Sequence, residues 1–152
     1  MKWFFSLGLI ATVLAAFAFT SCSKDDDDDS IVGKWEYTST KIEGNEYSKT
    51  YDREEGESEI FEFKSDGTCV NTTEYDGDID VVTGKYTTSG NTLSIIDDED
   101  GDEYKIKFSV SGNTLTLYEE GYYDLKEGEF CETQPAGENY VKVKMSMIYK
   151  RK

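Results

Sequence analysis

A five-residue sequence that occurs twice constrains this fold more than any other feature. Ser89–Leu93 reads Ser-Gly-Asn-Thr-Leu, and the same residues recur at Ser111–Leu115, 22 residues later. Gly followed by Asn between runs of alternating apolar and polar residues is typical of a two-residue β-hairpin turn. The repeat therefore predicts two successive hairpins. Their strands are expected at 81–88 and 92–96, and at 104–110 and 114–118.

Alternation of apolar and polar residues predicts further strands at 33–42, 59–64, 68–75 and 140–149. No stretch of ten residues in this part of the chain has apolar residues at helical spacing. A meander of about eight antiparallel strands leaves no free edge if it closes on itself, so we expect an all-β, up-and-down barrel. A β-sandwich is the alternative. An immunoglobulin-type sandwich places its Trp between two bridged cysteines, whereas Trp35 precedes both Cys69 and Cys131.

The N-terminus has the three parts of a secretory leader: Lys2, an apolar run over 3–19, and small residues before Cys22. A transmembrane helix is the alternative by length, but charge directly after Cys22 favours a processed leader. Phe19-Thr20-Ser21-Cys22 resembles the lipobox of bacterial lipoproteins, with Phe19 where Leu is commoner. The resemblance implies cleavage before Cys22 and attachment of palmitate-type acyl chains to that residue. The expected parts are a signal peptide at 1–21, a lipidated Cys and tether at 22–30, and a barrel domain at 31–152.

Five consecutive aspartates, Asp25–Asp29, follow the lipidated Cys and predict a solvated, extended tether. An acidic run at this place is similar to the surface-export signal of lipoproteins from Bacteroidota, a phylum of Gram-negative bacteria. The resemblance implies a lipid-anchored protein on the cell surface, in the outer membrane. A plain acidic spacer on a lipoprotein that faces the periplasm is the alternative.

Charge and composition exclude several functions. With 32 Asp and Glu against 16 Lys and Arg, the net charge of -16 excludes nucleic acid as a partner. The chain has no His, which removes the commonest general base and zinc ligand, and it has no Gly-rich phosphate loop. We therefore expect neither an enzyme nor a cofactor. The acidic stretches 76–80 and 97–103 lack the spacing of calcium-binding EF-hands, so we interpret them as solvated hairpin tips and expect no metal site.

Three segments resemble small lipocalin-like domains of Bacteroidota lipoproteins. These are Gly33-Lys34-Trp35, which looks like the Gly-x-Trp start of lipocalins, and the stretches 61–68 and 84–93. The resemblance covers residues 31–149 and implies a barrel that binds a small apolar ligand. The expected cavity lining is aromatic: Trp35, Tyr37, Phe61, Phe63, Tyr86, Tyr104 and Phe108. Tyr122, Tyr123 and Phe130, in a long loop before the last strand, are the expected lid.

The same aromatic residues allow a second reading, in which they fill a narrow barrel. The domain would then be a packed surface module that contacts protein or glycan through its loops, and exposed rings at Tyr122 and Tyr123 would support it. Cys69 and Cys131 are a possible disulfide in an oxidising compartment. Two separate cysteines, with Cys69 as a small core residue, are the alternative.

Overall fold

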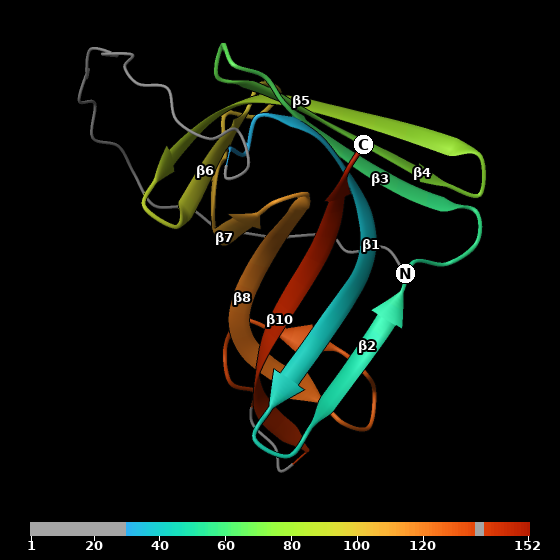
Figure 1. Ribbon diagram of the computed structural model, residues 1–152. Coiled ribbons are helices and arrows are strands. Elements are labelled where there is room, and N and C mark those ends of the chain that lie inside the picture. The colour runs from blue at the N-terminus through green and yellow to red at the C-terminus, as the bar shows by residue number, and fades with distance from the viewer. Residues whose placement is uncertain (1–29, 136–138) are drawn as a thin grey trace.

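The computed structural model describes residues 30–135 and 139–152, so the predicted signal peptide, lipidation site and tether up to Asp29 lie outside the described residues. In the described parts the regular structure is entirely β (Figure 1). These parts contain no helix long and apolar enough to cross a bilayer. The strands are β1 (Gly33–Gly44), β2 (Ser48–Asp52), β3 (Glu57–Phe63), β4 (Thr68–Tyr75), β5 (Asp78–Ser89), β6 (Thr92–Asp97), β7 (Glu103–Ser111), β8 (Thr114–Asp124), β9 (Phe130–Cys131) and β10 (Tyr140–Arg151).

The ten strands form one antiparallel sheet. Nine of them follow the order β10-β1-β3-β4-β5-β6-β7-β8-β9, and β2 pairs with β1. Pairing of β10 with β8 joins the two sides of the sheet, so that eight strands form a closed circuit while β2 and β9 extend from β1 and β8. The predicted all-β, up-and-down barrel is confirmed, and the β-sandwich alternative is wrong. All eight predicted strands are present, whereas β2 and β9 were not predicted.

The two predicted hairpin turns each contain two residues. Ser89 pairs with Thr92, and Ser111 pairs with Thr114, at the ends of adjacent strands. Gly90 and Gly112 have φ angles of 57° and 56°. A positive φ at the first central residue is typical of a type II′ turn, which matches the twist of the flanking strands and requires Gly at that position.

Strand β8 is longer than the sequence predicted, because it continues beyond Tyr118 to Asp124. Its second half pairs with β10 on one edge, from Ser146 opposite Tyr118 to Tyr140 opposite Asp124. Tyr122 and Tyr123 therefore belong to a strand, and their predicted position in a loop is wrong. Gly121 interrupts the apolar pattern there for a packing reason: a Cβ at this position would collide with the ring of Phe130.

Two groups of buried side chains stabilise the barrel. The closed-end core lies near the β3–β4, β5–β6 and β7–β8 turns and consists of Ile31, Trp35, Phe63, Cys69, Leu93, Leu115, Leu117 and Tyr149. The second core lies between β1, β8 and β10 toward the other end and consists of Ile42, Tyr123, Val143 and Met145. Partly buried Met147 contacts both groups, so one strand, β10, connects the two cores.

Trp35 organises the closed end. Its ring is fully buried, and its indole Nε1 donates a hydrogen bond to the carbonyl oxygen of Ile31 at 2.7 Å. The guanidinium of Arg151, from the last strand, lies 4.3 Å from the centre of the Trp35 ring. Arg151 also donates hydrogen bonds to the carbonyls of Ser30 and Val32. These contacts fix the residues before β1 to the end of β10 at the closed end of the barrel.

Replacement of Trp35 tests this arrangement. We expect Trp35→Ala to lower the free energy of unfolding by about 3–5 kcal/mol, because it leaves a large cavity in the closed-end core. Urea unfolding followed by circular dichroism measures the loss. Lys34→Ala, on the outer face of the same strand, is the control and should cost less than about 0.5 kcal/mol. A loss for Trp35→Ala close to that of the control would contradict the central role of this ring.

Candidate functional site

The inward face of the barrel is defined here as the face that carries Trp35. Direct cross-strand partners share a face, and Trp35 pairs with Phe61, which pairs with Asn71, which pairs with Val82. By the same pairing rule and the period of two along each strand, the predicted lining residues all lie on this face. Trp35 and Phe63 are buried in the closed-end core. The other five, which are Tyr37, Phe61, Tyr86, Tyr104 and Phe108, are partly buried.

Beyond the closed end, the strands separate into two walls. Residues 33–36 of β1 pair with β3, whereas residues 39–43 pair with β2, and the register of β1 with β10 shifts between Tyr37 and Ser39. The first half of β5, before Gly84, pairs with β4 alone. Strands β3, β4 and β5 consequently project as one wall, and β2, β1, β10, β8 and β9 form the other (Figure 1).

The projecting wall exposes the apolar side chain of Val82 on its inward face. Val82 is 41% exposed although it shares this face with Phe61, whose ring packs against Tyr149 and Phe63 in the closed-end core. Val81, on the outer face of the same strand, is 54% exposed. On the inward face, Val82 thus carries apolar side chain beyond the sealed core, where the opposite wall does not cover it.

A polar cluster interrupts this surface next to the closed-end core. One carboxylate oxygen of Glu59, Oε1, accepts hydrogen bonds from the Asn71 amide at 2.9 Å and from the Tyr149 hydroxyl at 3.3 Å. Burial raises the pKa of the Glu59 carboxyl. Burial and the neighbouring charge of Glu59 also raise the pKa of Tyr149 well above its ordinary value. Tyr37, whose hydroxyl bonds Thr40 at 2.8 Å, lies beside the cluster.

Glu59 was not among the residues predicted from sequence, although its position in the strand pattern gives a signal. Glu59 precedes Phe61 and Phe63 by two and four residues, so the period of two along a strand places it on the same face. A carboxyl group in that register is unusual for a face that is otherwise apolar, and the pattern alone could have identified it as a candidate site residue.

A second carboxyl group, Glu119, lies on the opposite wall. It falls on the inward face because it is two residues from buried Leu117 and opposite Met145. Its Oε2 atom is buried and accepts no hydrogen bond from the described residues. Burial and, secondarily, the charge of Glu132 raise the pKa of this carboxyl.

The three predicted lid residues do not all lie on one side of the sheet. Tyr123 is buried in the second core, where its hydroxyl is 2.5 Å from that of Tyr51 and its ring contacts Tyr47. Phe130 packs against the same core. Tyr122 alternates with Tyr123 along β8 and faces the opposite side. Tyr123 is only 4% exposed, so the two tyrosines do not form an exposed patch for contact with protein or glycan.

Cys69 and Cys131 are both free, and the possible disulfide is not formed. The physical reason is their separation: Cys69 belongs to the closed-end core, whereas Cys131 pairs with Tyr122 beside the second core. Burial, together with the charges of Asp98 and Asp97, raises the pKa of the Cys69 thiol to about 11. Cys69 is therefore a small core residue, as the alternative interpretation proposed.

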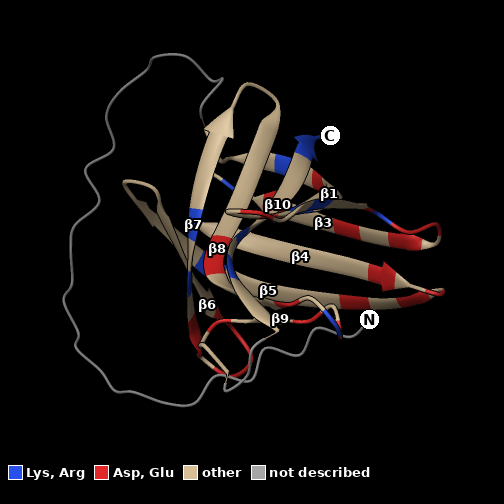
Figure 2. Cartoon of the chain, turned by 90° about the horizontal axis from the view of Figure 1, so that it is seen from below, with Lys and Arg blue, Asp and Glu red and all other residues tan. Residues whose placement is uncertain are grey.

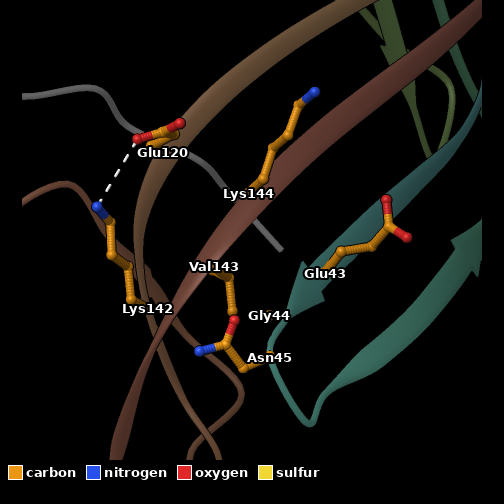
Figure 3. Close-up of a pocket in the computed structure, with 7 residues that line it drawn as sticks. All are labelled: Glu43, Gly44, Asn45, Glu120, Lys142, Val143 and Lys144. Carbon is orange, nitrogen blue, oxygen red and sulfur yellow. Dashed lines mark ion pairs between the residues drawn. The ribbon is translucent and has the colours of Figure 1, made fainter.

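A polar hollow of about 260 Å³ lies outside the barrel, between the ends of β1, β8 and β10 (Figure 3). Its walls carry charges of both signs, and Glu120 and Lys142 form an ion pair across 3.8 Å. The hollow has little apolar lining and is distinct from the predicted aromatic cavity. Among the residues that the structure describes, no three acidic, His or Cys side chains gather at a spacing that would hold a metal ion.

Comparison with known families identifies the fold. Residues 31–117, more than half of the chain, match the sequence model of the lipocalin-like domain family. This chain belongs to the lipocalin-like domain family. The match spans β1 to β7 and the start of β8, and it includes the Gly33-Lys34-Trp35 start of the barrel. No curated protein and no solved structure matches the chain. Lipocalin-like proteins are generally binding proteins, and the inward face of this barrel is compatible with such a role.

The stability of this lipocalin-like domain should depend on pH through Glu59. Because its pKa in the folded state is raised above 4.5, the contribution of Glu59 to stability is present below that pH and is lost as the pH rises through the folded-state pKa. Glu59→Gln keeps an oxygen acceptor but cannot ionise. We therefore expect its unfolding free energy, relative to the original chain, to increase between about pH 4 and about pH 7.5.

Urea unfolding at both pH values measures this difference. Glu74→Gln, on the exposed outer face of β4, controls for the loss of one negative charge. A difference that is constant with pH for Glu59→Gln would show that burial does not perturb this carboxyl.

The two thiols should differ in reactivity. We expect iodoacetamide to label Cys131, which is partly exposed, in the folded lipocalin-like domain, whereas Cys69 reacts only after unfolding because it is buried and mostly protonated. Peptide mapping by mass spectrometry separates the two sites. Recovery of a disulfide-linked pair of peptides without reductant would contradict the structure.

Proposed function

We propose that the protein is a lipid-anchored lipoprotein of the outer membrane, displayed on the cell surface, whose barrel binds a small ligand with an apolar body. The observation that carries the ligand-binding part is the uncovered apolar surface on the inward face, represented by Val82 and the partly buried ring of Phe61. In a filled barrel, both side chains would be covered by neighbouring side chains. Apolar surface that faces a common interior and continues into a sealed core is suited to a small ligand.

The proposed anchor is supported by sequence: the apolar leader, the lipobox-like residues 19–22 and the acidic run Asp25–Asp29. Several acyl chains on one Cys would hold the protein at a membrane, whereas a single chain binds only weakly. The strongly negative net charge of -16 is unsuited to electrostatic binding of anionic lipids, so the acyl chains would provide the attachment.

Two neighbouring valines of β5 provide a matched test of ligand binding. Val82→Trp adds a large ring to the inward face, and Val81→Trp adds the same ring to the outer face. We expect native mass spectrometry of the full chain, purified from its own cell envelope, to detect a bound small molecule in the original protein and in Val81→Trp. Val82→Trp should lose at least about 90% of it, because the ring occupies the space of the ligand.

Circular dichroism establishes that both variants keep the β-sheet. Either of two results would overturn the proposed ligand: an original protein whose mass is that of polypeptide and acyl groups alone, or equal occupancy in the two variants. The first result would instead favour the packed surface module that contacts protein or glycan.

The anchor has a separate test. We expect Cys22→Ala to abolish incorporation of labelled palmitate and to release the protein from the membrane fraction or leave its leader uncleaved, because Cys22 is the proposed acylation site. Cys69→Ala is the control for loss of a cysteine and should keep the label. A Cys22→Ala protein that is still labelled and membrane-bound would refute the anchor.

A further inference from the structure

We propose that the ligand is a small organic cation, an ammonium group on an apolar or aromatic body, and that Glu59 is its principal counter-ion. This inference rests on the proposed ligand-binding function and adds the chemistry of the ligand's polar end. It follows from the distribution of charge on the inward face, from the hydrogen bonds of Glu59 and from the rings around it.

Negative charge gathers on the inward face of the projecting wall. Glu59 pairs with Thr73, which pairs with Asp80, so both carboxyl groups face inward. Two residues nearer the projecting ends of the strands, Glu57 pairs with Tyr75, which pairs with Asp78, so these two carboxyl groups also face inward. Figure 2 shows acidic residues as red bands on the projecting parts of β3 and β5. Glu119 adds a fifth inward carboxyl from the opposite wall.

The positive charges on inward positions of the described strands are already engaged. Arg151 lies over Trp35 at the closed end and bonds two carbonyl groups. Lys49 of β2 lies over the ring of Tyr51, 4.4 Å from its centre. None of the ion pairs between described residues includes Glu59 or Glu119. The inward face therefore carries negative charge that the described residues do not neutralise.

Glu59 has one oxygen fixed and the other available. Both described donors, Asn71 and Tyr149, bind Oε1, and no described residue donates to Oε2. These two hydrogen bonds hold Oε1 in place. A buried carboxylate is costly without a charged partner, so a cation next to Oε2 would gain a strong, charge-assisted interaction.

The tyrosine that bonds this carboxylate belongs to a cluster of aromatic rings. The Tyr149 ring, whose hydroxyl bonds Glu59, lies edge-on to Tyr37 and Phe61, with ring centres 5.6 and 5.7 Å away. The negative face of an aromatic ring attracts an ammonium group, and the attraction is larger away from water. A carboxylate bordered by rings favours an organic cation over a neutral ligand. It disfavours a fatty-acid-like anion, because that head group would approach like charges.

Three probes with one body and different heads test the charge preference: 4-phenylbutylammonium, 4-phenylbutanol and 4-phenylbutyrate. Isothermal titration calorimetry with the full chain in phosphatidylcholine nanodiscs measures each affinity at neutral pH, and empty nanodiscs give the partition baseline. We expect the ammonium probe to bind at least about tenfold more tightly than the alcohol, and the anion to bind most weakly.

Glu59→Gln should reduce the affinity for the ammonium probe at least about tenfold while changing that of the alcohol less than about twofold, since only the charged interaction is lost. Glu74→Gln, on the outer face, should leave both affinities unchanged and controls for net charge. Equal binding of the three probes, or tighter binding of the anion, would overturn the cation proposal and leave the apolar ligand site in place. Binding of none of the probes would overturn the cation proposal, and the Val81 and Val82 variants would then decide the ligand site separately.

Discussion

Pairing of β10 on both of its edges is the constraint on which the rest of this structure depends. One edge of the strand bonds β1 and the other bonds β8 along almost its whole length. The hydrogen bonds convert a meander with two open edges into a closed circuit. Because β10 also contributes Tyr149 to the closed-end core and Met145 to the second core, the same strand joins the two packed regions. The inward face exists as one continuous surface because of this strand.

The features that were predictable from sequence are those that depend on local residues. The turn at Gly90 requires a positive φ, so the hairpin could be predicted from its Gly. The period of two along β7 places Tyr104 and Phe108 on one face, so the side of the sheet that they occupy could be predicted too. Strand β2 could not, because Ser48–Asp52 has no apolar alternation and pairs only with the far half of β1. The extension of β8 was hidden by Gly121, which is needed for the packing of Phe130.

The sequence predicted which side of the sheet the candidate site residues occupy, but it did not predict how deeply each one is buried. Trp35 and Phe61 are direct partners on one face, yet Trp35 is sealed and Phe61 is partly covered. The difference arises because β1 exchanges one neighbour for another near Tyr37, and this exchange separates the two walls. Such an effect depends on strands distant in sequence. Glu59 is different, because the period of two along β3 gives its side of the sheet, whereas its hydrogen bonds come from β4 and β10.

The position of Ser30 has a consequence for orientation. Arg151 fixes the carbonyl of Ser30 to the closed end, beside the hairpin turns and the end of β10. Ser30 thus lies at one end of the domain, and the projecting parts of β3, β4 and β5 lie at the other. The carboxyl groups on the projecting parts of β3 and β5 therefore lie at the opposite end of the domain from Ser30.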